Sequence, residues 1–197
     1  NKSQSSNDTI PTAMHIATVL AIHRELLPSI TYIKKSLQKK IREFSGIIKI
    51  GRTHTQDATP IKLSSEFRAF HDQISYAEEN IKKSINKLYY LAQGGTAVGS
   101  GVNAPKTFDK KFIKHLNRFT KLHFKSANNK YEALASHDVF IEVMAGIEIL
   151  TSSVFKMAND IRVLASGPRS GIAELILPAN EPGSSIMPGK INPTQCE

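Results

Sequence analysis

The sequence predicts an all-α fold, an elongated bundle of long helices that oligomerises into a multi-helix core. Three observations support this class. Apolar residues recur at spacings of three and four in three long segments, convincing strand patterns are absent, and the last segment approaches a strict heptad. Helices of this length with near-heptad stripes require partners of similar length. With 197 residues, 40% of them hydrophobic, the chain can bury a substantial core.

The first long helix is expected to follow the polar segment at residues 1–9. Asp8 and Thr9 are candidate caps, and Pro11 falls in the first turn, where a missing N–H is harmless. Pro28 lies inside the apolar stripe, and because the stripe resumes in register we expect a kink rather than an end. The stripe consists of Ile16, Val19, His23, Leu26, Ile30, Ile33, Leu37, Ile41 and Phe44.

Three further helices are expected. A second stripe runs over residues 67–92, a shorter helix over residues 107–122 follows the glycine-rich segment 94–101, and a third stripe runs over residues 139–164. Residues 47–50 form at most a short extended connector. The proline- and glycine-rich residues 167–191 predict a long irregular loop before a new helix near Pro193. Because this loop holds a polar cluster, we interpret it as functional.

The composition limits the function classes. The formal net charge of +9 is compatible with nucleic-acid binding, but aromatic residues make up only 7% of the chain and there is no tryptophan. The lysines are better explained as solvated helix faces, so we expect no nucleic-acid partner. No apolar run approaches the roughly 20 residues that span a bilayer, so no membrane partner is expected. The single cysteine, Cys196, excludes an internal disulfide and cannot alone hold a zinc ion or iron–sulfur cluster.

The most informative polar cluster is the serine loop, residues 183–192. Its glycines allow the backbone N–H groups to approach a ligand. Lys190 and Asn192 supply a positive charge and an amide suited to a carboxylate or phosphate, and Ser184 and Ser185 are candidate reactive or hydrogen-bonding groups. The spacing does not fit a nucleotide-binding P-loop. Such a composition also fits a plain turn, and both interpretations stay open from these residues alone.

Two more polar clusters lie at helix boundaries. Residues 5–8, Ser-Ser-Asn-Asp, precede the first helix, where an anion site and simple capping are both possible. Residues 51–57 lie between the first two helices and include Thr53 and His54. A histidine can transfer protons near neutral pH, although a lone histidine is more often structural.

Taken together, the three clusters resemble three motifs of the fumarase/aspartase superfamily, at residues 1–8, 51–57 and 183–192. The last motif is similar to the superfamily signature Gly-Ser-x-x-Met-x-x-Lys-x-Asn. His54 and Gly189 resemble class II fumarase, because aspartases tend to have glutamine and alanine at these positions. Thr55 and residues 62–66 depart from the family pattern, at positions with no implied substrate contact.

The resemblance implies a metal-free and cofactor-free hydro-lyase that interconverts fumarate and L-malate through a carbanion intermediate. Ser184 would remove the C3 proton, and His54, oriented by Glu197, would act at the leaving hydroxyl, directly or through a water. The implied substrate-binding residues are Ser5, Ser6, Asn7, Thr53, Ser185, Lys190 and Asn192.

The resemblance also implies an architecture and partners. Residues 1–197 would be an incomplete central helical domain, without the N- and C-terminal domains of the family, and would be weakly active or inactive alone. The partners would be a small dicarboxylate and, in a homotetramer, other copies that share each active site. The compartment would be the bacterial cytoplasm or the mitochondrial matrix. An ammonia-lyase acting on aspartate and a non-catalytic helical oligomerisation module remain the alternatives.

Overall fold

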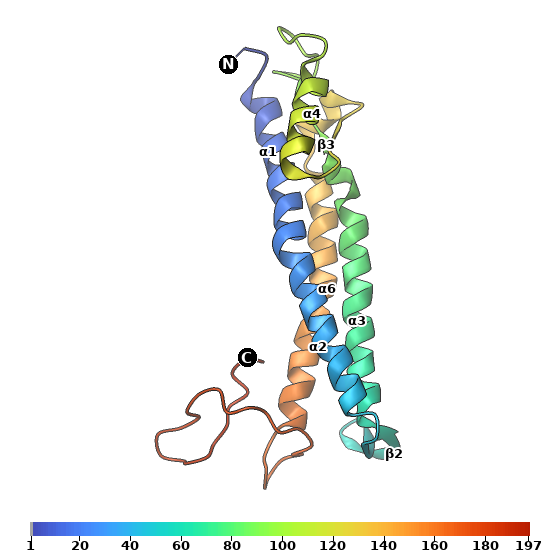
Figure 1. Ribbon diagram of the computed structural model, residues 1–197, viewed down its shortest axis with the longest axis vertical. Coiled ribbons are helices and arrows are strands. Elements are labelled where there is room, and N and C mark those ends of the chain that lie inside the picture. The colour runs from blue at the N-terminus through green and yellow to red at the C-terminus, as the bar shows by residue number, and fades with distance from the viewer. Residues whose placement is uncertain (1) are drawn as a thin grey trace. The chain divides into compact units, whose positions relative to one another are not determined.

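The computed structural model describes residues 2–197 (Figure 1). The chain divides into two compact units, Asn1–Ile149 and Leu150–Glu197, and each is described by itself. Long helices dominate, so the predicted all-α class of long helices is confirmed. Among the described residues, none of the helices combines the length and apolar character needed to cross a bilayer.

The first helical run comprises α1 (Ser6–Ala21), a π-helical turn η1 (Ile22–Leu26) and α2 (Leu27–Glu43). The helix continues through Pro28 as predicted, and the irregularity lies in the preceding turn, where the backbone N–H of Leu27 donates to the carbonyl of Ile22. Proline has no N–H to donate, and π-turns are one way in which a helix absorbs such a defect. The predicted caps, Asp8 and Thr9, were wrong: Ser5 is the N-cap, three residues earlier.

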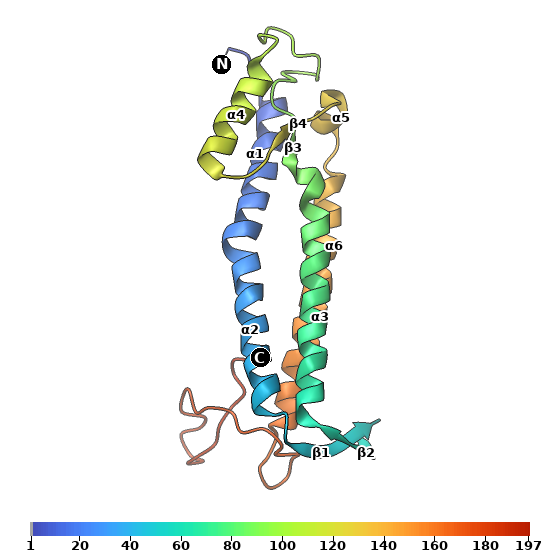
Figure 2. The same ribbon diagram turned by 45° about the vertical axis from the view of Figure 1, so that its right-hand side comes forward.

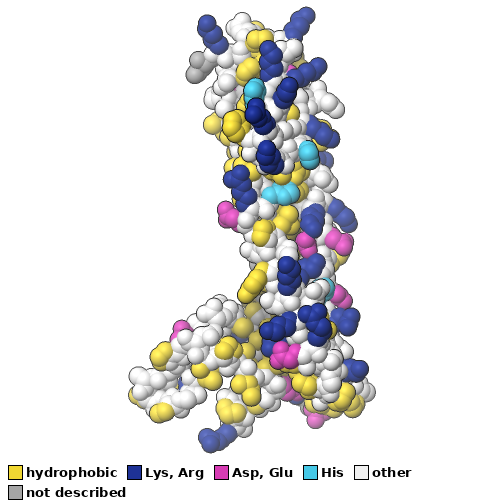
Figure 3. Space-filling model, in the orientation of Figure 1, with side chains coloured by type: hydrophobic (Ala, Val, Ile, Leu, Met, Phe, Trp, Pro, Cys, Tyr) yellow, Lys and Arg dark blue, Asp and Glu magenta, His cyan; other side chains and the backbone are white. Residues whose placement is uncertain are grey.

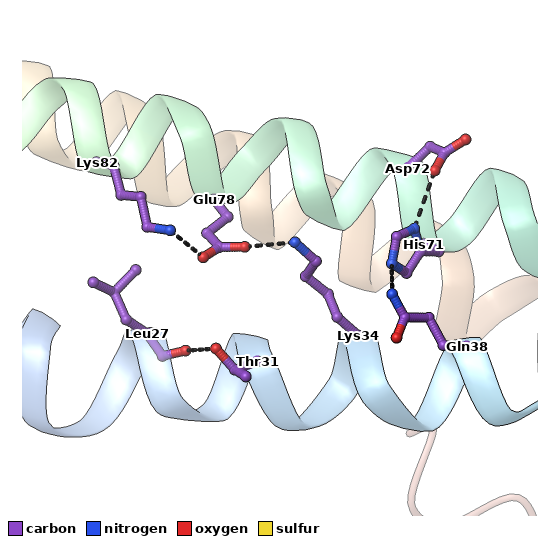
Figure 4. Close-up of polar contacts among 8 residues, drawn as sticks. All are labelled: Leu27, Thr31, Lys34, Gln38, His71, Asp72, Glu78 and Lys82. Carbon is purple, nitrogen blue, oxygen red and sulfur yellow. Dashed lines mark hydrogen bonds and ion pairs between the residues drawn. The ribbon is translucent and has the colours of Figure 1, made fainter.

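The core of the first unit lies between this run and α3 (Leu63–Ser84), which lies beside α2 in both ribbon views (Figure 2). An ion-pair network joins the same two helices: the Glu78 carboxylate accepts hydrogen bonds from Lys34 of α2, at 2.8 Å, and from Lys82 (Figure 4). The chain leaves α3 through a 3₁₀ turn, η2 (Ile85–Tyr89), so the second helix ends before the predicted residue 92. The buried apolar side chains include Val19, Ile30, Leu37, Phe67, Phe70, Ile74, Ile81 and Leu88.

The expectation that strands are absent was wrong. Strands β1 (Ile48–Thr53) and β2 (Gln56–Lys62) form an antiparallel hairpin between α2 and α3. The second strand is exposed at all but one position, so it lacks the apolar alternation that identifies strands from sequence. A further pair, β3 (Tyr90–Leu91) and β4 (Lys125–Ser126), is parallel and two residues long.

The remaining helices are α4 (Phe108–Thr120), α5 (Lys130–Ala135) and α6 (Asp138–Leu164). Helices α4 and α6 confirm the predicted ranges, whereas α5 was not predicted. After Leu164, the described residues contain neither helix nor strand, which agrees with the predicted long irregular loop. The prediction of a helix near Pro193 was wrong. The chain makes a single turn there, in which the Pro193 carbonyl accepts a hydrogen bond from the backbone N–H of Cys196.

Lysine and arginine side chains spread along the visible helical face, with acidic side chains between them (Figure 3). Several lysines of the described chain are paired with carboxylates, among them Lys40 with Glu43 and Lys130 with Asp109. This distribution fits the interpretation of the lysines as solvated helix faces.

Candidate active site

The N-terminus of α1 carries the helix-entry cluster, Ser5, Ser6 and Asn7. The Oγ of Ser5 accepts a hydrogen bond from the backbone N–H of Asn7 at 3.2 Å. The side chains of Ser6 and Asn7 are exposed, and the Asn7 amide donates to the carbonyl of Ala97 at 2.7 Å. Because a helix N-terminus carries partial positive charge, this cluster is suited to an anion. The matched motif starts at Asn1, which lies outside the described residues.

Asp8 anchors the helix-entry cluster, a role that the sequence did not reveal. Its side chain is fully buried, at 0% exposure. One carboxylate oxygen accepts a hydrogen bond from the backbone N–H of Ser5 at 2.9 Å, and the other accepts from the backbone N–H groups of Gly94 and Thr96 at 3.0 and 2.9 Å. The sequence contains one signal for this role, the Ser-x-x-Asp spacing of a capping box. That spacing indicates only the contact of Asp8 with the backbone N–H of Ser5.

The second cluster lies at the tip of the β1–β2 hairpin. Thr53 pairs with Gln56, so His54 and Thr55 alone form the turn. Both have positive φ angles, 53° and 63°, which is the sign pattern of a type I′ turn that usually contains Asn and Gly. Left-handed backbone at two non-glycine residues is strained, and such strain concentrates at functional positions. The exposed His54 side chain therefore lies at the tip of the hairpin, on a strained backbone.

The helix-entry cluster and the hairpin tip do not meet within one copy. The run from Ser6 to Glu43 is a continuous helical path of 38 residues, 43 − 6 + 1. At about 1.5 Å per residue, this run is about 55 Å long. Figures 1 and 2 show the start of α1 and the hairpin at opposite ends of the run.

The serine loop, residues 183–192, directs two backbone N–H groups at one hydroxyl. The Oγ of Ser184 accepts hydrogen bonds from the N–H groups of Ile186 and Met187, both at 3.3 Å. N–H groups placed in this way stabilise negative charge on the oxygen. Ser184 is half-buried, whereas its neighbour Ser185 is exposed.

The serine loop closes on itself through its other predicted residues. The Lys190 ammonium donates to the Asn192 side-chain oxygen at 2.6 Å, and the Asn192 amide donates to the Gly183 carbonyl at 3.1 Å. A Cβ at Gly183 would lie 1.9 Å from the Lys190 carbonyl oxygen, so only glycine allows this closure. Lys190 and Asn192 are therefore together, while Glu197 is exposed in the turn that follows Pro193.

Within the first unit, the predicted site residues thus form two separate groups, and the serine loop belongs to the second unit. Two cavities of about 550 and 530 Å³ in the first unit are lined by none of them. Within residues 2–197, no group of three or more His, Cys, Asp and Glu side chains is placed to hold a metal ion.

Known proteins resemble this chain over its whole length. It is 55% identical over 197 residues to the mitochondrial fumarate hydratase of Schizosaccharomyces pombe and 56% identical to the class II fumarate hydratase of Rickettsia bellii. Each alignment covers 100% of this chain but only 38% and 42% of those proteins. The chain therefore spans about two fifths of the length of these relatives.

Solved structures give the same result. The class II fumarase from Schistosoma mansoni superposes with a TM-score of 0.96 at 41% identity, covering 100% of this chain and 44% of that one. A fumarate lyase:delta crystallin structure from Brucella melitensis superposes with a TM-score of 0.93 at 37% identity, covering 100% and 42%. A family model described as Lyase matches residues 1–197. The chain therefore belongs to this family of lyases.

Proposed function

We propose that this chain provides part of the active site of a fumarate hydratase, which interconverts fumarate and L-malate. The observation that carries the proposal is the Ser184 oxygen with two N–H donors, in a loop that also presents Lys190 and Asn192. The names of the relatives, all fumarate hydratases at 55–56% identity over the whole chain, support the same reaction.

In the malate-to-fumarate direction, Ser184 acts as the base. Its alkoxide removes a proton from C3 of malate, and the electron pair passes into the adjacent carboxylate. A serine hydroxyl is a weak base, so the alkoxide has to be stabilised, and the N–H groups of Ile186 and Met187 supply that stabilisation.

Lys190 and Asn192 hold the carboxylate that gains charge as C3 loses its proton. A charge-assisted hydrogen bond contributes about 1.5–3 kcal/mol, and the part that grows in the transition state accelerates the reaction. In this structure, each of these side chains already bonds within the loop, so substrate binding requires them to exchange partners. Lys190 keeps further N–H donors for this purpose.

Water leaves from C2 on the opposite face of the substrate. His54, oriented by Glu197, donates the proton to the departing hydroxyl either directly or through a bound water, and fumarate remains. Ser5, Ser6, Asn7, Thr53 and Ser185 bind the substrate in this scheme. No metal or organic cofactor takes part.

The proposed site requires several copies of the chain. The helix-entry cluster and the hairpin tip lie at opposite ends of a helical run of about 55 Å, far beyond the span of a small diacid. We propose a homotetramer in which each site draws on three subunits. The exposed apolar side chains of α6 support this homotetramer, because large exposed apolar surfaces are typical of protein–protein contacts. Examples are Ile141, at 72% exposure, and Phe155, at 70%.

The proposed whole protein contains more than these residues, since the matched relatives are more than twice as long. We propose that residues 1–197 correspond to an incomplete central helical domain of such a protein, in a bacterial cytoplasm or a mitochondrial matrix. Residues 1–197 alone are then expected to be weakly active or inactive, because they correspond to only about two fifths of the length of the relatives.

The test uses a chimaera in which this chain replaces the corresponding segment of the Rickettsia bellii fumarate hydratase, beside the chain alone. Formation of fumarate from L-malate is followed by ultraviolet absorbance. The chimaera is expected to be active, and Ser184→Ala to reduce kcat by at least about a hundredfold. Ser36→Ala, on the exposed face of α2, is the matched control. An inactive but folded chimaera, or full activity after Ser184→Ala, would refute the proposal. Supplying L-aspartate in place of malate tests the ammonia-lyase alternative.

A further inference from the structure

We infer that Asp8 is a positioning residue for substrate binding, which acts through residues 93–97 on the amide of Asn7. The inference rests on the proposed function, because it assigns Asn7 to the substrate site. Asp8 itself is fully buried and cannot touch a ligand.

The surroundings of Asp8 are unusual for a buried carboxylate. Its two oxygens accept hydrogen bonds from the backbone N–H groups of Ser5, Gly94 and Thr96, from the Gln93 amide at 3.3 Å and from the Thr9 hydroxyl. Among the described residues, no lysine or arginine pairs with it. Its charge is therefore stabilised by oriented dipoles and by the N-terminus of α1.

The segment that receives Asp8 is a backbone anion site. Gly94 and Thr96 have φ angles of 94° and 58°, and their N–H groups converge on the same carboxylate oxygen. Alternating backbone conformations of this kind form concave sites for anions, and here the anion is the protein's own side chain. Left-handed backbone is unfavourable at threonine, so the carboxylate compensates a conformation that the segment would otherwise avoid.

The next residue transmits this order to the proposed substrate site. The Ala97 carbonyl accepts a hydrogen bond from the Asn7 amide at 2.7 Å. This contact fixes which end of the amide faces the segment, while the Asn7 side chain as a whole remains exposed. Without Asp8, the segment loses its anchor, and the Asn7 amide loses its fixed partner.

The test is Asp8→Asn in the chimaera described above. Asparagine has the same shape, but it offers one acceptor oxygen and one NH₂ group, so it cannot accept hydrogen bonds on both sides. KM for L-malate is expected to rise about tenfold or more, as for the loss of one charge-assisted hydrogen bond, with a smaller change in kcat. A purely structural role would lower the amount of folded enzyme and leave KM unchanged.

Asn117→Ala is the matched control. Asn117 also makes two backbone hydrogen bonds, both to Phe124, at 2.8 and 2.9 Å. It is expected to lower thermal stability without changing KM.

A double-mutant cycle tests the route from Asp8 to the ligand. If Asp8 acts through Asn7, then Asp8→Asn has little further effect on KM once Asn7→Ala is present. Independent, multiplying effects of the two substitutions would overturn the inference, as would an unchanged KM in Asp8→Asn. If Asp8→Asn does not fold, Gln93→Met is measured in its place. It is expected to raise KM by a smaller factor, and an unchanged KM would overturn the inference. An inactive parent chimaera would refute the proposed function and, with it, the substrate site on which this inference rests, whereas an active parent with an unchanged KM in Asp8→Asn would refute this inference alone.

Discussion

Glu78→Gln should destabilise the packing of α2 against α3 by removing one charge from a well-packed network. The Glu78 side chain is only 10% exposed and bonds Lys34, itself 25% exposed, at 2.8 Å and also Lys82 (Figure 4). Burial raises the pKa of Glu78, but the hydrogen bonds and charges of the two lysines outweigh it, so its pKa lies below 4.5. The carboxylate is therefore charged in the folded state at neutral pH.

The expected loss is about 1.5–2 kcal/mol of unfolding free energy at neutral pH. The bond to Lys34 accounts for most of it, as a part-buried hydrogen bond between charged groups. The bond to Lys82 adds little, because that side chain is 55% exposed and its charge is screened by water. Since the pKa of Glu78 is lower in the folded state, its contribution is present above pH 4.5 and is lost as the pH falls through the folded-state value.

Urea unfolding followed by far-ultraviolet circular dichroism measures this loss. Glu43→Gln is the control, because the Glu43–Lys40 pair is about half exposed on both sides and should contribute less than about 0.5 kcal/mol. The difference between Glu78→Gln and the parent should disappear in acid. A loss no larger than that of Glu43→Gln, or a difference that persists after Glu78 is protonated, would contradict this account.

Two further predictions follow from burial and close approach. Burial lowers the pKa of His15 below 6.5, so the chain should lose stability as the pH falls below 6.5. His15→Gln should flatten that loss in urea titrations. Gly183→Ala should abolish the closure of the serine loop against Lys190 and reduce kcat of the chimaera by at least about tenfold, because a misplaced catalytic group loses its alignment. Gly46→Ala, where an added Cβ meets nothing within 4 Å, should leave both activity and thermal stability unchanged.

The helices were predictable where one apolar face is buried against another. The stripe of α6 followed from its apolar spacing, whereas α4, which has no buried residue, was expected only as a short helix after the glycine-rich segment. The β1–β2 hairpin was not predictable in this way. Its second strand has the sequence Gln-Asp-Ala-Thr-Pro-Ile-Lys and is held by backbone pairing instead of a buried face. The start of α1 was misjudged because Asp8 and Ser5 are both good caps, and only the hydrogen bonds distinguish the cap from the third helical residue.

The contacts inside each candidate cluster could be anticipated because each cluster is local in sequence. The hydrogen bonds that Ser184, Lys190 and Asn192 make in the serine loop each span fewer than ten positions along the chain. The role of Asp8 was not predictable in the same way. Its partner Gly94 is 86 positions away, and no periodic pattern or spacing rule links the two. The resemblance to a family implied the candidate site residues, but it did not indicate the contacts of Asp8.

The π-turn in the first helical run sets the length of that run. Ile22 and Ile30 are both buried, at 4% and 2% exposure, and are eight positions apart, 30 − 22. In a regular α-helix, eight residues overshoot two turns by about 80°, and the wider turn at Ile22–Leu26 absorbs the excess. Deleting one residue there should restore ordinary geometry and keep both isoleucines on the packed face. The same deletion elsewhere in α1 or α2 should rotate every later side chain by about 100°, so this one turn is where the helix tolerates a change in length.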